Sequence, residues 1–205
     1  MKTSTTLSAA ALAAIAAGTA SAAITVTQSN SGTTYGTTLN FDEPGTPTGI
    51  VPNDTWAGMG LAIMDAGDGQ SQVFDASEPW IGDGNSFLGV FGVFMTFSTD
   101  LTAFSGQVWD PSGPPGGFGG GFGVFVFNDG VEVGNLIGEP AWGGLGDSWI
   151  DISVADGMVF DEVRILGFGF FPTTYVDNLS WNAVPTPGSL AFLGLAGLAT
   201  TRRRR

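Results

Sequence analysis

Residues 23–183 contain no sustained apolar stripe with helical spacing, and this absence argues against a fold built from packed helices. The apolar residues come instead in short runs of Val, Ile, Phe and Thr, which clusters of Gly, Asp, Asn and Pro separate. Glycine is abundant, with 33 residues, and aromatic residues make up 12% of the chain. Together these features predict an all-β domain, and the number of short runs favours a two-sheet sandwich.

The expected strands share a high content of β-branched and aromatic residues, and they cover residues 24–27, 60–64, 86–97, 101–109, 122–127, 131–133, 149–154, 163–171 and 174–181. Asp129 and Gly130 follow Asn128 in a sequence typical of a tight hairpin turn. Trp109, Trp149 and Trp181 lie in alternating strand patterns. We therefore expect these three tryptophans in the core.

Three short motifs in order resemble galactose-binding-like jelly rolls. They are Phe41-Asp42-Glu43 early in the chain, Asn128-Asp129-Gly130 midway, and residues 175–179 at the end. The resemblance implies a jelly-roll-like β-sandwich over residues 23–183. That fold hosts carbohydrate binding and also purely structural roles, so the fold does not decide the function.

The first 22 residues have the organisation of a secretory signal peptide. Lys2 provides a basic start, residues 7–18 form an Ala-rich apolar core, and Ala20 and Ala22 form an A-x-A cleavage site around Ser21. The sequence therefore predicts a protein that is exported across the inner membrane and loses residues 1–22.

The C-terminal residues 184–205 combine a proline motif, an apolar run and a basic end. The motif is Val184-Pro185-Thr186-Pro187-Gly188, and the chain closes on Arg202, Arg203, Arg204 and Arg205. This order resembles the PEP-CTERM sorting signal of exported Gram-negative bacterial proteins, although Thr186 stands where that family has Glu. The resemblance implies recognition by an exosortase, a membrane transpeptidase, and sorting to the cell surface or extracellular matrix.

A permanent membrane anchor is the alternative interpretation of this tail. Residues 187–201 would form a helix of about 22 Å, whereas the hydrocarbon core of a bilayer is about 30 Å thick. A short, Gly-rich hydrophobic helix suits a disposable signal better. We therefore expect a transient contact with the inner membrane and favour processing.

Composition removes several classes of function. The chain has no histidine and no cysteine, which excludes Ser-His-Asp and Cys-His nucleophiles, imidazole zinc sites and disulfides. All nineteen acidic residues lie between Asp42 and Asp177, where Arg164 is the only basic residue. We therefore expect no nucleic-acid partner. We also expect no enzymatic activity, although paired carboxylates leave glycoside hydrolysis open.

A structural calcium ion is the one cofactor that this sequence predicts. The first and last strands of a jelly roll are commonly neighbours, which would bring Asp42 and Glu43 close to Asp177. A bound cation would relieve the repulsion between these carboxylates and join the two ends of the domain. The alternative is that Asp42 and Glu43 are ordinary loop residues and that Asp177 caps a turn. The calcium-loop-like segments at residues 65–69 and 143–147 are interpreted as turns.

Trp80 and Trp142 are the candidate glycan-binding residues. Each follows a Glu-Pro pair closely and is expected in a loop, where an indole beside a carboxylate could stack on a sugar. Each could equally cap the end of the sandwich, which we favour. The main functional expectation is thus a structural or interaction protein of the extracellular matrix, and the alternative is a carbohydrate-binding module of the exopolysaccharide.

Processing at both ends can be tested by mass spectrometry of the protein isolated from its native cell surface. We expect an N-terminus near Ala23 and a C-terminus that lacks Arg202 to Arg205, because both terminal segments resemble removable signals. A mature protein that keeps its four arginines would contradict sorting with cleavage and favour the permanent anchor.

The calcium site can be tested by thermal melts of the mature domain with excess calcium and with a chelator. Calcium at a hundred times its dissociation constant should stabilise the fold by about 2.7 kcal/mol. The calcium-dependent shift should disappear in Asp177→Ala. Identical melts with calcium and with chelator would remove the site.

Overall fold

The computed structural model describes residues 24–74, 84–109, 121–138, 148–155, 157–168 and 173–185. The predicted signal peptide and most of the predicted sorting tail lie outside these ranges, as do Trp80 and Trp142. Among the described residues, no helix is long and apolar enough to cross a membrane.

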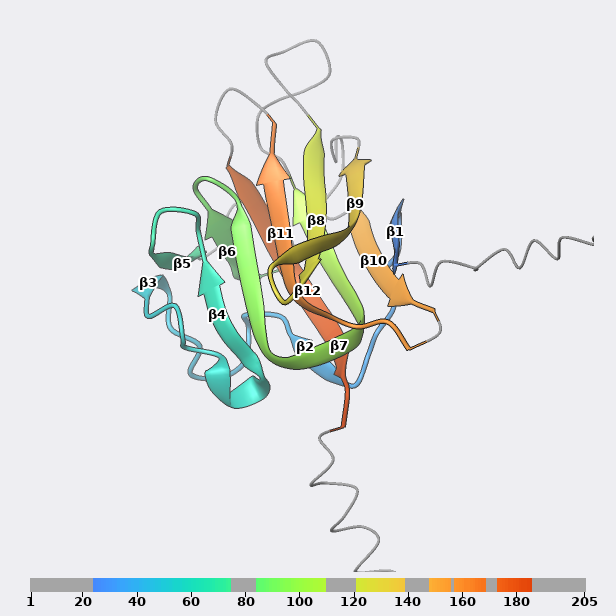
Figure 1. Ribbon diagram of the computed structural model, residues 1–205. Coiled ribbons are helices and arrows are strands. Elements are labelled where there is room, and N and C mark those ends of the chain that lie inside the picture. Colours follow the sequence, from blue (N-terminus) through green and yellow to red (C-terminus); the bar gives the residue numbers. More distant parts are fainter. Residues whose placement is uncertain are drawn as a thin grey trace, which may run out of the picture.

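Strands make up most of the described chain, and every strand pairing is antiparallel (Figure 1). The strands are β1 (Ile24–Ser29), β2 (Thr37–Leu39), β3 (Gly49–Val51), β4 (Leu61–Asp65), β5 (Ser71–Phe74), β6 (Ser86–Gly89), β7 (Val93–Trp109), β8 (Phe122–Asn128), β9 (Val131–Gly138), β10 (Trp149–Val154), β11 (Phe160–Gly167) and β12 (Thr174–Ala183). A single 3₁₀ turn, η1 (Ala57–Met59), precedes β4 in the described chain.

The long strand β7 belongs to two layers. Its first part, residues 93–97, pairs with β4 on one side and with β11 on the other. Its second part, residues 101–109, pairs with β10 and β12. Figure 1 shows β7 in green, running down one layer, bending at the bottom and continuing upward in the other. The first layer is therefore β4-β7-β11-β8-β9. The second is β3-β5-β6-β12-β7-β10-β1, in which β2 also pairs with β12.

From β9 to the end of the domain, successive strands alternate between these layers. The chain passes from β9 in the first layer to β10 in the second, back to β11 in the first, and ends with β12 in the second. This alternation is the wrapping pattern of a jelly roll. The predicted all-β, jelly-roll-like sandwich is confirmed.

The core lies between the two layers and consists of side chains that alternate along each strand. Val93 and Met95 of β7 face it in the first part of that strand, and Phe104 and Val108 in the second part. Trp181 of β12 packs against Phe97 with ring centroids 5.4 Å apart. The prediction that Trp181 lies in the core is correct.

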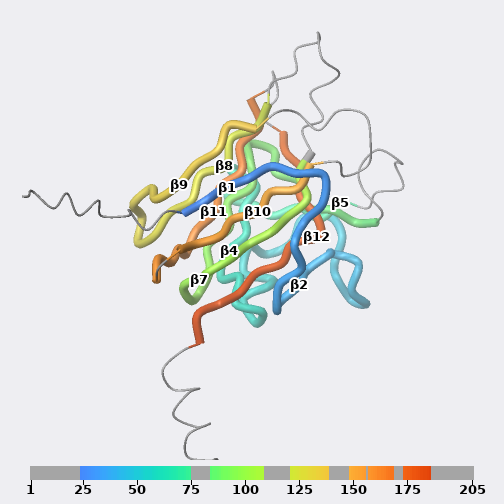
Figure 2. The backbone as a smooth tube through the Cα atoms, turned by 90° about the vertical axis from the view of Figure 1, so that its right-hand side faces the viewer, coloured from blue at the N-terminus to red at the C-terminus, as the bar shows by residue number. Residues whose placement is uncertain are grey.

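A segment between β1 and β2, residues 30–36, crosses the outer face of the second layer (Figure 2). We call it the crossing segment. The backbone N–H of Thr33 donates to Ser105 Oγ and to Asp151 Oδ1, at 3.2 and 3.0 Å. Ser180 Oγ accepts from the N–H of Tyr35 and donates to the carbonyl of Thr33. Polar side chains that would otherwise face water are therefore buried beneath this segment.

The structure differs from the strand prediction at several points. The predicted strand over residues 86–97 is interrupted by a turn before β7, where Gly92 has a φ of +113° that favours glycine. Residues 98–100, expected to separate two strands, instead lie within β7 at its bend. The short strands β3 and β5 were not predicted. The predicted hairpin is correct, with φ of 50° at Asp129 and 76° at Gly130.

The burial of the core-facing side of β10 can be tested by replacing Ile152 with alanine and comparing it with the same replacement at an exposed isoleucine. Ile152 is fully buried, whereas Ile50 on β3 is 72% exposed. We expect Ile152→Ala to lower the free energy of unfolding by about 2–5 kcal/mol and Ile50→Ala to change it by less than about 0.5 kcal/mol. Urea denaturation measures both values, and equal losses would contradict the assigned faces.

Candidate functional site

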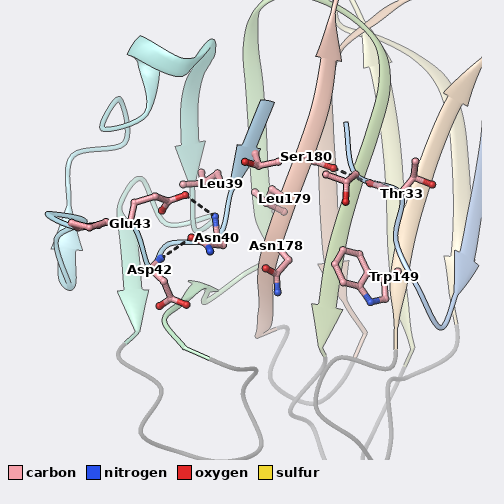
Figure 3. A pocket seen from close by; sticks show the side chains of 12 residues that line it. Thr33, Leu39, Asn40, Asp42, Glu43, Trp149, Asn178, Leu179 and Ser180 are labelled. Carbon is pink, nitrogen blue, oxygen red and sulfur yellow. Dashed lines mark hydrogen bonds between the residues drawn. The ribbon is translucent and has the colours of Figure 1, made fainter. Parts of the chain in front are cut away.

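A pocket of about 450 Å³ opens on the outer face of the second layer, beside the crossing segment (Figure 3). Its lining is polar and apolar in about equal parts and consists of Thr33, Thr34, Thr38, Leu39, Asn40, Asp42, Glu43, Pro44, Trp149, Asn178, Leu179 and Ser180. Figure 3 shows Asn40 and Asp42 on one side, Trp149 on the opposite side, and Asn178 between them.

A β-bulge in β12 forms the base of the pocket. The pairing of β12 with β7 shifts between Asp177 and Ser180, because β12 has one extra residue in this stretch relative to β7. Asn178 takes up the extra length with a positive φ of 49°, a conformation that Asn tolerates better than most residues. Its Nδ2 donates to Gln107 Oε1 at 2.8 Å, which fixes the orientation of the amide.

One wall is the loop that follows β2, and a buried aromatic residue holds this loop in place. Phe41 is fully buried, although its φ of 59° is unusual for a side chain of this size. Its ring packs edge-on against Trp56, with ring centroids 5.4 Å apart. Burial of Phe41 leaves its neighbours Asn40 and Asp42 exposed at the mouth of the pocket.

Hydrogen bonds to backbone N–H groups set the orientation of the two carboxylates of this loop. Asp42 Oδ1 accepts from the backbone N–H of Asn85, just before β6, at 2.7 Å. Glu43 Oε1 accepts from the N–H of Asn40 at 3.1 Å, and Asn40 Oδ1 accepts from the N–H of Asp42. Both acidic residues line the pocket with a fixed orientation.

The opposite wall is the indole of Trp149, at the start of β10. Trp149 is half-buried and lines the pocket, so the expectation that it lies in the core is wrong. The reason is strand alternation: Ile150 and Ile152 face the core, which turns Trp149 and Asp151 to the outer face. Gly32 lies so close that an added Cβ would be 1.9 Å from the indole Cε3.

Tyr35 lies near this wall on the crossing segment. Burial raises the pKa of its phenol above the usual value, the hydrogen bond with Thr33 lowers it, and the nearby Asp151 carboxylate raises it further. The phenol therefore stays neutral at physiological pH.

The predicted calcium ligands fall in two places. Asp42 and Glu43 line the pocket, whereas Asp177 is fully buried on β12 and its Oδ1 accepts from the N–H of Asn178. In the part of the chain that the structure describes, no group of three or more acidic, His or Cys side chains is arranged to hold a metal ion. Structural calcium stays a prediction.

Most other predicted site residues lie outside the described ranges. They are Ala20, Ala22, Trp80, Trp142, Thr186, Pro187, Gly188 and Arg202 to Arg205. Of the sorting motif, the structure describes Val184, whose N–H donates to the carbonyl of Asp100 at 2.8 Å, and the exposed Pro185. Three lining residues were not predicted as site residues from the sequence: Thr33, Trp149 and Asn178. The alternation around Trp149 was a signal that could have placed it on the outer face.

No protein-family model matches the sequence, and no curated protein matches it either. Among solved structures, the chain is similar to a family 6 carbohydrate-binding module whose binding sub-sites were dissected by crystallography and calorimetry. The identity is 13% and the TM-score 0.38, over 67% of this chain and 95% of that chain.

A second similar structure is CsCBM6-3 from Clostridium stercorarium, solved in complex with cellobiose. Here the identity is 9% and the TM-score 0.37, over 73% of this chain and 95% of that chain. At these identities and TM-scores we carry neither a ligand nor a site over from these modules.

Proposed function

We propose that the protein is an exported, non-catalytic glycan-binding module and that its outer-face pocket holds a sugar unit of an extracellular polysaccharide. The observation that carries this proposal is the half-buried indole of Trp149 facing the oriented side chains of Asn40 and Asp42 across one pocket. A volume of about 450 Å³ lies within the usual range for small-molecule sites.

The two walls suit the two kinds of surface that a sugar presents. The C–H groups of a pyranose ring form an apolar face that can lie against an indole. Its hydroxyl groups are donors that carboxylates bind through charge-assisted hydrogen bonds, which are stronger than neutral ones. Asp42 and Glu43 both line the pocket, and one carboxylate oxygen of each accepts a hydrogen bond from a backbone N–H. Binding thus needs no reacting group.

This pocket favours the binding role over the purely structural role that the sequence analysis placed first. We propose that the two are connected, because a protein that binds polysaccharide is thereby held in the matrix. Export by residues 1–22 and sorting by the PEP-CTERM-like tail, with an exosortase as the processing partner, remain part of this proposal. The described chain ends at Pro185, directly before the remainder of that tail.

Replacing Trp149 tests the proposed site. We expect Trp149→Ala to weaken glycan binding at least tenfold, because a central aromatic residue commonly contributes most of the binding energy at such a site. Trp149→Tyr should retain most of the affinity, since it keeps an aromatic ring. A glycan array identifies the ligand, and titration calorimetry on the mature domain measures the affinities.

Asn178 offers a second test of the pocket. Asn178→Gly suits the positive φ at this position but removes the hydrogen bond to Gln107 Oε1, so the free energy of unfolding should fall by about 1 kcal/mol. Asn178→Ala should cost roughly 1 kcal/mol more because of its Cβ. Both should bind glycan several-fold more weakly than the parent. Unchanged affinity in the Trp149 and Asn178 variants would refute this pocket as the site.

A further inference from the structure

We infer that this pocket selects uncharged glycans and discriminates against glycans that carry carboxylate, sulfate or phosphate groups. The inference rests on the proposed function and names the substrate class of the same site. Its basis is the charge of the lining, the position of the nearest available cation, and the hydrogen-bonding character of the groups that a ligand would meet.

Within the described chain, no cation neutralises the negative charge of the lining. Asp42 and Glu43 are exposed, and their hydrogen-bond partners are backbone N–H groups, which are neutral. Among the described residues, no basic side chain lines the pocket, whose other members are hydroxyl, amide, apolar and aromatic residues. An anionic sugar unit would therefore enter a site of its own sign without a cation to pair with.

The single basic side chain in the described chain is on the other side of the molecule. Arg164 lies on β11 between the inward-facing Val163 and Ile165, so it faces outward from the first layer. Its Nε pairs with Glu162 Oε1, and its guanidinium lies 4.2 Å from the ring centroid of Phe127. The whole sandwich and these contacts separate Arg164 from the pocket, so it cannot offset the charge of Asp42 and Glu43.

The charged groups of the pocket are hydrogen-bond acceptors. The carboxylates of Asp42 and Glu43 can only accept hydrogen bonds when ionised. Asn178 already donates through Nδ2 to Gln107, and its Oδ1 is an acceptor. Neutral sugars supply hydroxyl donors in abundance, whereas carboxylate, sulfate and phosphate groups supply further acceptors. Hydrogen bonding and charge thus favour the same class of ligand.

The test compares neutral polysaccharides with their anionic counterparts of the same backbone. Two pairs serve as probes: linear β-mannan with mannuronan, and β-glucan with the same glucan oxidised at C6. Affinities are measured by calorimetry at low salt with a chelator present, so that no divalent cation masks the carboxylates. Within the pair that the protein recognises, we expect the neutral polysaccharide to bind at least tenfold more tightly than the uronate. This ratio of affinities should fall as salt is added.

A charge-matched pair of double variants assigns the discrimination to the pocket. Asp42→Asn with Glu43→Gln removes two charges from the lining while keeping oxygen acceptors for the loop. Asp68→Asn with Glu132→Gln removes two charges from residues that do not line the pocket. The first pair should reduce the neutral-to-uronate ratio to about one, and the second should leave it unchanged.

The outcomes separate this inference from the function on which it rests. Binding of a uronate as tightly as its neutral counterpart would overturn the selectivity while leaving glycan binding in place. Discrimination that persists in Asp42→Asn with Glu43→Gln, or that falls equally in both double variants, would overturn the role of these two carboxylates. Binding of no probe of either kind would refute the proposed function, and the inference with it.

Discussion

The hydrogen bonding of one bent strand joins the two halves of this protein. β7 pairs with β4 and β11 before its bend and with β10 and β12 after it, so each layer is built outward from a part of the same strand. The apolar residues that alternate along both parts face the space between the layers. In a domain without disulfides, this shared strand and the core that it lines keep the two sheets together.

The pocket is a consequence of how the outer face of the second layer is covered. A sheet face that carries Ser105 and Ser180 would normally be exposed to water. Both serines are buried, and both form hydrogen bonds with the backbone of the crossing segment. The crossing segment leaves the bulged part of β12 uncovered beside it. The loop anchored by Phe41 and the indole of Trp149 then enclose that uncovered surface.

The fold class was predictable because alternation and turn chemistry are local properties. Asp129 and Gly130 determine a hairpin by their own conformational preferences, and the pattern from Trp149 to Ile152 defines a strand and both of its faces. Correct use of that pattern would also have placed Trp149 outside the core. The short strands β3 and β5 escaped prediction because they carry little alternation and owe their pairing to neighbouring strands.

The candidate site was less predictable, because its parts meet only through tertiary structure. Asp42 and Glu43 were identified from the sequence, but their neighbours across the pocket depend on the bulge at Asn178, which the register of β12 against β7 determines. Nothing local to Thr33 indicates that it will line a pocket with a residue from the last strand. The sequence thus identified candidate ligating groups without the partners that make them a site.

The hydrogen bond between Ser180 and Thr33 joins residues 147 positions apart, and it has a consequence for the order in which the molecule is made. The crossing segment has no partner on β12 until nearly the whole domain has been synthesised, so the pocket belongs to the contacts of longest range, which form slowly. Under the proposed export, a chain that crosses the membrane unfolded would therefore carry no assembled pocket in transit. The proposed binding of polysaccharide would begin only after the domain has folded.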